Sequence, residues 1–528
     1  MTTAHFRPNR GVVAAGHALT ADAGAEMLRQ GGNAFDAAIA AAFTACVTES
    51  VLTSLGGGGF LLAHTADGQD CLFDFFCQTP QTHRSPENLQ FFPIEANFGD
   101  TVQEFHIGLG AIAVPGTVAG LLAIHQRLGR LPLKTIIAPA QHWATQGSQI
   151  EPFRAYCFQI LAPILTATPA AKAIYAPNGK LLQEGDDFYL SDFASFLDEL
   201  LHQGTDLIYQ GRLAHQLAQD CKAQGGYLQL VDLQAYRMIE RQPLSVPYRN
   251  ATLLTNPPPS SGGALIAFAL NLLATVGSAL GDHASPSHVA ALREVMQLTN
   301  LARQDGYDQH LYQSDIAQQF LSVVHTEPYR QQLQAAVQAR SVNKWGSTTH
   351  ISAIDAEGNA VSMTTSNGEG AAYILPGTGV MMNNMLGEED LNPQGFHQWP
   401  PNQRISSMMA PTIVLENGFP RLVLGSGGSN RIRTAILQVI SNVLDFGMEL
   451  EAAVNAPRLH WERGAFHLEP GYDRNTLESQ GIGTADDCTW WQTRNMFFGG
   501  VHAVGLSPGG EFAGVGDARR NGACVVVT

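Results

Sequence analysis

The sequence predicts an α+β fold built in layers, and three observations favour this fold class. Two helices stand close together near the start of the chain, and the second, at 34–47, is so rich in alanine that it should pack on several sides. A β-hairpin is predicted at 348–365, where β-branched residues flank a polar, glycine-containing turn. A strand at 422–424 runs through a glycine-rich turn into an amphipathic helix at 432–448.

The composition is that of a large globular protein. Hydrophobic residues make up 45% of the 528 residues and charged residues 14%, and no linker divides the chain into separate domains. A formal charge of −16 without a basic patch argues against nucleic acid as a partner. The 18 histidines show no metal-ligand spacing, so we expect neither a metal ion nor a cofactor.

Nothing in the first residues predicts export. Residues 1–16 lack an apolar core of signal-peptide length, and no run approaches the roughly 20 apolar residues of a membrane helix. Seven cysteines without a CxxC pair are typical of reduced thiols. We therefore expect a cytoplasmic protein that contacts no membrane.

The first part of the chain joins helices through glycine-rich turns. Thr20 is predicted to cap a helix that runs to Gln30, and Asn33 to cap the next helix. Four glycines at 56–59 precede a strand. They either cradle an anion with their amides or mark a close approach of two backbones, and both explanations stay open. A buried strand is expected at 71–77.

The middle of the chain is predicted to be mostly helical. Helices broken by prolines extend to about residue 223, and helical patterns return at 286–338. Between these regions a proline-rich turn at 256–263 leads into an apolar helix at 264–273. A polar loop at 340–347 then feeds the hairpin.

Three polar side chains share one face of the first hairpin strand. Because side chains alternate along a strand, Thr348, His350 and Ser352 point the same way. Alone, this pattern is more typical of packing than of catalysis. The glycine-rich turn at 425–431 has two interpretations as well: an anion or oxyanion site made by free amides at a helix start, or an ordinary tight turn.

Taken together and in order, these segments resemble the γ-glutamyltransferase family of N-terminal-nucleophile hydrolases. The matching segments are 31–38, 56–60, 114–116, 258–263, 348–352, 358–362, 383–384, 406–412, 425–432 and 516–520. The resemblance implies a four-layer α/β/β/α sandwich made as one inactive precursor. It further implies cleavage before Thr348 into a large chain, 1–347, and a small chain, 348–528, which together form one intertwined domain.

The resemblance also assigns roles to residues of this sequence. Thr348 would be the nucleophile, and its freed α-amine, with a reference pKa of about 7.7–8.0, the base that activates its hydroxyl. The oxyanion donors would be the amides of Gly427 and Gly428, or of Gly428 and Ser429, depending on the alignment. The remaining residues would support the threonine and bind the substrate: Ser366, Asn367, Glu388, Ser406 and Ser407. His350 is expected to be a positioned neighbour rather than a base.

Three departures from the family pattern concern the substrate. The family grips the α-carboxylate of a γ-glutamyl group with an arginine followed by a glutamate, and here Phe76 and Cys77 stand at those positions. Phenylalanine cannot form a charge-assisted bidentate bond to a carboxylate. Apolar Met385 follows the Asn-Asn motif, and Gly427 stands where the family has proline.

These departures leave two explanations of the acyl site open. Arg84 or Arg404 replaces the missing arginine, or the site takes a more apolar acyl group that packs on Phe75 or Phe76.

Three functions therefore compete. The first is a self-processing γ-glutamyltransferase-like enzyme that hydrolyses or transfers the acyl group of an amide such as glutathione. The second is an amidohydrolase or acylase of the same fold that acts on another amide. The third is a processed protein that only binds. A γ-glutamyl anilide distinguishes the first from the second, and a broad panel of amides tests the third.

Overall fold

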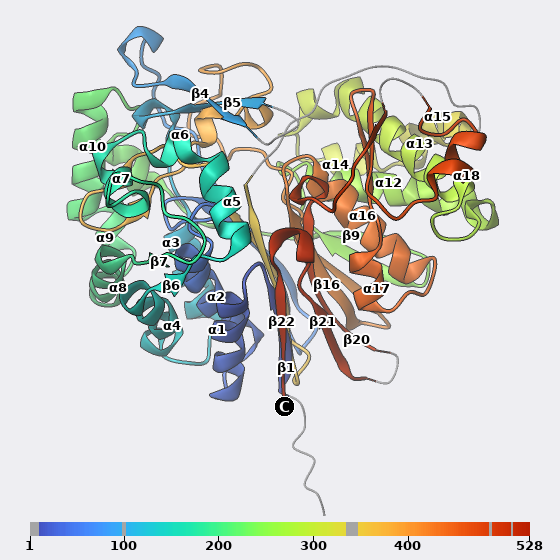
Figure 1. Ribbon diagram of the computed structural model, residues 1–528, viewed down its shortest axis with the longest axis horizontal. Helices are drawn as coiled ribbons and strands as arrows, with labels where there is room; N and C mark the ends of the chain where they lie inside the picture. Colours follow the sequence, from blue (N-terminus) through green and yellow to red (C-terminus); the bar gives the residue numbers. More distant parts are fainter. Residues whose placement is uncertain (1–9, 98–101, 334–346, 485–487, 508–509) are drawn as a thin grey trace, which may run out of the picture.

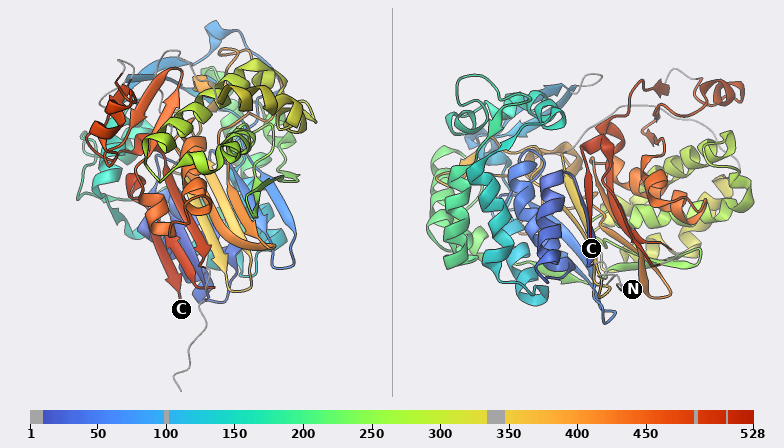
Figure 2. Two further views of the ribbon diagram at one scale, coloured as in Figure 1. Left: turned by 90° about the vertical axis from the view of Figure 1, so that its right-hand side faces the viewer. Right: turned by 60° about the horizontal axis from the view of Figure 1, so that its bottom comes forward.

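Two antiparallel sheets pack face to face between two layers of helices in the computed structural model of the chain (Figure 1). The structure describes residues 10–97, 102–333, 347–484, 488–507 and 510–528, so 340–346 of the predicted loop lie outside the described residues. The two further views show the same order of helices, sheet, sheet and helices (Figure 2). The predicted four-layer α/β/β/α sandwich is confirmed.

Strands from distant parts of the chain make up the two large sheets. The first sheet contains, in order, β22 (Ala523–Val527), β1 (Gly11–Ala15), β11 (Thr349–Asp355), β12 (Ala360–Ser366), β2 (Gly58–His64), β3 (Asp70–Asp74) and β8 (Ile239–Arg241). The second contains β21 (Phe512–Val515), β20 (Gly500–Leu506), β16 (Phe419–Gly427), β15 (Thr412–Glu416), β10 (Ala251–Thr255) and β9 (Leu244–Tyr248). In the first sheet, strands from before and after residue 348 therefore lie side by side: β1 lies between β22 and β11, and β12 pairs with β2.

Helices cover the outer face of each sheet. Those outside the first sheet are α1 (Ala18–Arg29), α2 (Ala34–Thr48), α3 (Thr117–Leu128), α4 (Leu133–Gln146), α5 (Pro152–Ile160), α6 (Ala162–Leu165), α7 (Pro169–Tyr175), α8 (Ser191–Gln203), α9 (Asp206–Tyr209), α10 (Arg212–Gln224) and α11 (Leu230–Ala235). Those outside the second are α12 (Gly262–Val276), α13 (Pro286–Ala302), α14 (Ile316–Phe320), α15 (Val323–Leu333), α16 (Arg431–Leu444), α17 (Leu450–Asn455) and α18 (Arg474–Ser479).

Shorter strands form small sheets at the periphery. They are β4 (Phe92–Asn97) with β5 (Val102–Ile107), β6 (Ser148–Gln149) with β7 (Asp187–Phe188), β13 (Ile374–Leu375) with β14 (Val380–Met381), and β17 (Leu459–Glu462), β18 (Ala465–Leu468) and β19 (Cys488–Trp490).

The helices near the start of the chain form largely as their sequences predict. Asn33 caps α2 in a reciprocal capping box, in which its side chain accepts from the amide of Asp36 at 2.9 Å. The predicted cap at Thr20 is wrong, because α1 begins at Ala18 and is capped by His17. Thr20 is buried within the helix instead and donates to the Glu49 carboxylate at 2.8 Å.

Of the two explanations for the glycines at 56–59, the structure favours the close backbone approach. Gly59 lies in β2 between β12 and β3, and a Cβ there would meet the carbonyl oxygen of Thr364 at 2.5 Å. A side chain at this position would push the two strands apart. The glycines therefore allow β2 to pack closely against β12.

One segment, Gly262–Leu280, is long and apolar enough to cross a membrane by length and composition. The expectation that no run of residues is long and apolar enough for a membrane helix is therefore wrong. In the fold this segment is the core helix α12 and the short turn after it, and 61% of its apolar window is buried inside the protein. The seven cysteines are free thiols.

Candidate active site

Thr348 lies directly before β11, between the two sheets, where it borders a cavity of about 330 Å³. Only 6% of the residue is exposed. Its hydroxyl donates to the carbonyl oxygen of Ser347 at 2.7 Å. The same carbonyl oxygen accepts a hydrogen bond from the hydroxyl of Ser366, also at 2.7 Å. The hydroxyls of Thr348 and Ser366 thus converge on the carbonyl of the peptide bond between residues 347 and 348.

His350 and Ser352 follow Thr348 on the same strand face, as the hairpin pattern predicts. The two ring nitrogens of His350 bond to the hydroxyls of Thr364 at 2.8 Å and Ser352 at 2.9 Å. Complete burial lowers the pKa of His350 well below its usual value, so the ring is neutral. His350 therefore organises hydroxyls between the sheets.

The glycine-rich turn of the second sheet meets the backbone of Thr348. A Cβ on Gly427 would lie 2.2 Å from the carbonyl oxygen of Thr348, so only glycine fits there. Gly427 is paired with Gly500 in the strand ladder, whereas Gly428 and Ser429 lie beyond it, before the first turn of α16. Within the described part of the chain, the amides of Gly428 and Ser429 donate no hydrogen bond to the protein.

Ser429 holds a backbone conformation that side chains rarely adopt, with φ at +50°. Its hydroxyl donates to the carboxylate of Asp390 at 2.7 Å, which ties the turn to the acidic loop after the Asn-Asn motif. The residue lines the cavity. Backbone strain of this kind, held in place by a specific contact, is common at functional sites.

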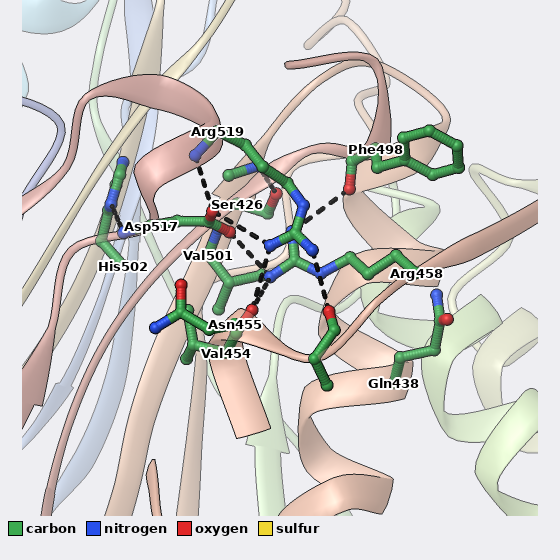
Figure 3. Close-up of polar contacts among 12 residues, drawn as sticks. Ser426, Gln438, Val454, Asn455, Arg458, Phe498, Val501, His502, Asp517 and Arg519 are labelled. Carbon is green, nitrogen blue, oxygen red and sulfur yellow. Dashed lines mark hydrogen bonds and ion pairs between the residues drawn. The ribbon is translucent and has the colours of Figure 1, made fainter. Parts of the chain in front are cut away.

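A buried ion-pair cluster supports the glycine-rich turn from behind (Figure 3). Asp517 is fully buried and accepts from the amide of Val501 at 2.8 Å, and it pairs with Arg458 at 2.7 Å and Arg519 at 3.2 Å. Both arginines hold the pKa of Asp517 far below its usual value. Because Val501 follows the residue paired with Gly427, the segment at 516–520 fixes the position of the turn.

The cavity is polar near Thr348 and apolar along its walls. Ser406 and Ser407 line it, and their role in binding substrate stays a prediction. Its apolar lining comes from Phe76, Leu311, Tyr312, Met385, Leu391, Trp399, Ile405 and Met408. The ring of Phe76 stacks on Phe60 at 5.3 Å, so the wall at the position of the family's arginine is a packed aromatic pair.

Neither of the two arginines considered as replacement anchors reaches the described lining of the cavity. Arg404 is buried behind the wall, where it pairs with Asp74 at 3.3 Å and donates to the Tyr236 hydroxyl at 2.7 Å and to the carbonyl of Phe76. Arg84 donates to backbone carbonyls at the end of α10. Both are structural, so the hypothesis of a replacement anchor at either position is wrong.

A basic residue that sequence reasoning missed does line the cavity. Arg303 lies at the end of α13, and its Nε donates to the carboxylate of Asp308 at 2.7 Å. It sits in a helical pattern far from every matching motif, so no local signal marks it. Its charge is largely balanced by that of Asp308.

Glu388 borders the cavity, and its carboxyl shares a hydrogen bond with Glu369. Burial raises the pKa of Glu369 to about 7, and burial with the nearby charge of Glu369 raises that of Glu388 well above its usual value. The pair therefore holds a proton at neutral pH. Sequence reasoning missed Glu369, although it stands two residues after Asn367 in the same motif.

Asn367 is placed differently from the other predicted residues. It is fully buried and does not border the cavity, and its side-chain amide has no hydrogen-bond partner among the described residues.

No metal site is found among the residues that the structure describes. They contain no group of three or more histidine, cysteine or acidic side chains arranged to hold a metal ion.

The fold and this arrangement together define a class of protein. A four-layer sandwich with a threonine directly before a central strand, and with free amides in the turn that follows the facing strand, is that of the N-terminal-nucleophile hydrolases. The gamma-glutamyltranspeptidase family model matches residues 20–527. The chain belongs to the γ-glutamyltranspeptidase family.

The relatives of the chain are enzymes named for two kinds of activity. It is 30% identical over 538 residues to the acylase ACY 1 proenzyme of Pseudomonas sp. (strain SE83), covering 98% of this chain and 94% of that protein. It is also 30% identical over 557 residues to the glutathione hydrolase proenzyme of Bacillus subtilis (strain 168), covering 98% and 91%.

A solved structure agrees on the fold. The crystal structure of cephalosporin acylase from Bacillus halodurans has a TM-score of 0.84 to this chain at 24% identity, over 98% of this chain and 96% of that one. The chain is therefore an enzyme of the γ-glutamyltransferase and acylase type, and the interpretation as a protein that only binds is set aside. The names of its relatives indicate a precursor that is processed.

Proposed function

We propose that the chain is a self-processing acylase that cleaves an amide with a largely apolar acyl group through a Thr348 ester. The observation that carries this proposal is the cavity wall at Phe76. A packed aromatic pair occupies the position of the family's arginine, and Arg404 is held behind it by Asp74 and Tyr236. A γ-glutamyl α-carboxylate placed there would lose its bidentate partner, whose contribution is on the order of 1.5–3 kcal/mol.

The contacts around Ser347 support self-cleavage as the first step. The hydroxyl of Thr348 adds to the carbonyl carbon of Ser347, and Ser366 stabilises the negative charge that develops on the carbonyl oxygen. The carbon–nitrogen bond then breaks as the proton of the hydroxyl passes to the nitrogen of Thr348, and the acyl group is left as an ester on the Thr348 oxygen. Water hydrolyses this ester to give a new carboxylate on Ser347 and a free α-amine on Thr348.

The same threonine then carries out turnover. Its α-amine takes the proton of its hydroxyl, which attacks the substrate carbonyl and forms an oxyanion facing the amides of Gly428 and Ser429. Collapse releases the leaving amine with a proton and leaves an acyl ester. Water resolves this ester in hydrolysis, and a second amine resolves it in transfer.

A second candidate substrate is a γ-glutamyl amide. The observation in its favour is Glu388, which borders the cavity beside Glu369 and can accept the α-ammonium of such a group. The apolar wall at Phe76 opposes it. Localisation in the cytoplasm stays a prediction for either substrate.

Two measurements test the proposal. Thr348→Ala should remain one uncut chain on a denaturing gel, and a chain cut at the same bond would rule out self-cleavage by Thr348. A panel of chromogenic anilides then compares an apolar acyl group, a γ-glutamyl group and a γ-glutamyl analogue without its ammonium. We expect the highest kcat/KM for the apolar acyl group, and preference for γ-glutamyl would overturn the acylase assignment.

A further inference from the structure

Glu369 is placed directly against the peptide bond that the proposed function cleaves. It follows β12 in the loop after Asn367, and its backbone amide donates to the side chain of Asn384 at 2.9 Å. The residue is only 1% exposed. Its carboxyl oxygen Oε1 accepts the amide hydrogen of Ser347 at 3.0 Å. A buried acid therefore bonds to the residue that supplies the carbonyl for self-cleavage.

Ser347 is held by contacts on both of its backbone polar groups. Its amide donates to Glu369, and its carbonyl oxygen accepts from the hydroxyls of Ser366 and Thr348. On the other side of the bond, the carbonyl of Thr348 accepts from Arg520 at 3.3 Å. Four hydrogen bonds thus hold the backbone on the two sides of this peptide bond. The one from the amide of Ser347 to Glu369 lies farthest toward the N-terminus.

We propose that Glu369 is a positioning residue for self-cleavage, which holds the amide of Ser347 so that its carbonyl carbon faces the hydroxyl of Thr348. The inference rests on the proposed cleavage between residues 347 and 348. Attack needs the two reacting atoms close together and aligned, and a small misplacement of one of them costs on the order of 10²-fold in rate. Without Glu369, the amide of Ser347 would be buried without its acceptor, and the residue would turn toward another one.

The hydrogen-bond acceptor, rather than the negative charge, should be what the cleavage needs. Burial raises the pKa of Glu369, which stands beside the carboxyl of Glu388 and near two further charged groups, Asp390 and Arg520. A carboxyl that carries its proton on one oxygen still accepts a hydrogen bond on the other. Glutamine keeps an acceptor at the same reach without a charge, whereas aspartate keeps the charge on a side chain one methylene shorter.

The test follows self-cleavage of the full chain by pulse labelling and a denaturing gel. We expect Glu369→Gln to cut within about three-fold of the wild-type rate, and Glu369→Asp and Glu369→Ala to cut about 10–100-fold more slowly. Rescue by glutamine is a result that general destabilisation would not produce. Fast cleavage by Glu369→Asp, or cleavage by Glu369→Gln as slow as that of Glu369→Ala, would overturn the inference.

Two controls separate the possible failures. Glu462→Gln changes another buried carboxyl, one that pairs with Arg433 and His460 instead of Ser347, and should cut at the wild-type rate. A slow Glu462→Gln would mean that any loss of a buried carboxyl slows cleavage, against the inference. Thr348→Ala must stay uncut in every background, and cleavage there would refute the proposed function itself, whatever the Glu369 variants do.

Discussion

Replacing Ser366 by alanine removes one hydroxyl from the carbonyl oxygen that becomes negative in the proposed self-cleavage. Ser366 donates to that oxygen at 2.7 Å and accepts from the amide of Gly368 at 3.0 Å. Loss of one oxyanion donor typically slows a reaction by about 10²–10³-fold, which is about 2.7–4 kcal/mol of barrier. We therefore expect Ser366→Ala to accumulate as uncut chain where the wild type is fully cut.

Ser362 provides a matched control on the same strand and the same face. It is fully buried, donates to the carbonyl of Leu424 at 2.8 Å and accepts from the amide of Thr412 at 2.9 Å. Each serine therefore makes one donated and one accepted backbone bond, and each alanine variant should lose about 1–3 kcal/mol of stability. Only the acceptor of Ser366, the carbonyl oxygen of Ser347, takes part in the proposed reaction.

The assay measures both quantities on the same preparations. The rate of self-cleavage comes from a time course on denaturing gels, and the free energy of unfolding from denaturant titration in a Thr348→Ala background, where no chain is cut. Equal loss of stability with slow cleavage in Ser366→Ala alone supports an oxyanion role. Wild-type cleavage by Ser366→Ala, or equal slowing in Ser362→Ala, would refute the reasoning.

Three further predictions concern the substrate, the support of the turn and the buried acid pair. Phe76→Arg should raise kcat/KM for a γ-glutamyl anilide at least ten-fold relative to an apolar acyl anilide, and an unchanged ratio would contradict the role given to the wall. Asp517→Ala should lower the free energy of unfolding by about 3–5 kcal/mol, because it leaves Arg458 buried without its partner, and a change below 1 kcal/mol would contradict this. Since the pKa of Glu369 is raised in the folded chain, the folded state binds more protons, and stability should fall on the order of 1–3 kcal/mol as pH rises from 5 to 8. Glu369→Gln should flatten this slope in uncut Thr348→Ala chains, and an equal slope in both would show that another group causes it.

Local patterns predicted those elements whose structure depends on neighbouring residues. The hairpin at 349–366 forms because two runs suited to strands flank a short polar turn, and its alternation puts His350 on the face of Thr348. The capping box of α2 forms because Asn33 and Asp36 satisfy each other's backbone amides. The cap of α1 was misplaced because Thr20 finds a buried carboxylate, on Glu49, that is distant in sequence.

Part of the candidate site was predicted as well, because several of its residues belong to short sequence motifs. Thr348, Ser406, Ser407 and Glu388 were named from motifs, and the structure brings all four to one cavity. Their roles in catalysis and binding stay predictions. The sequence also leaves Arg404 available for a substrate carboxylate, whereas its contacts with Asp74 and Tyr236 in the structure show that it is not.

By itself the sequence determined the class of fold, the threonine directly before the central strand and the loss of the family's arginine at position 76. The tertiary structure decided what replaces that arginine, which is a stacked pair of aromatic rings. It also showed that Ser366 and Glu369 hold Ser347 by its carbonyl and its amide. The two contacts to Ser347 span only 22 and 19 residues, across the β11–β12 hairpin. The alternation along a strand predicts which side chains share a face, but it does not predict the geometry of the loops beyond the strand ends, because that geometry is set only when the core packs.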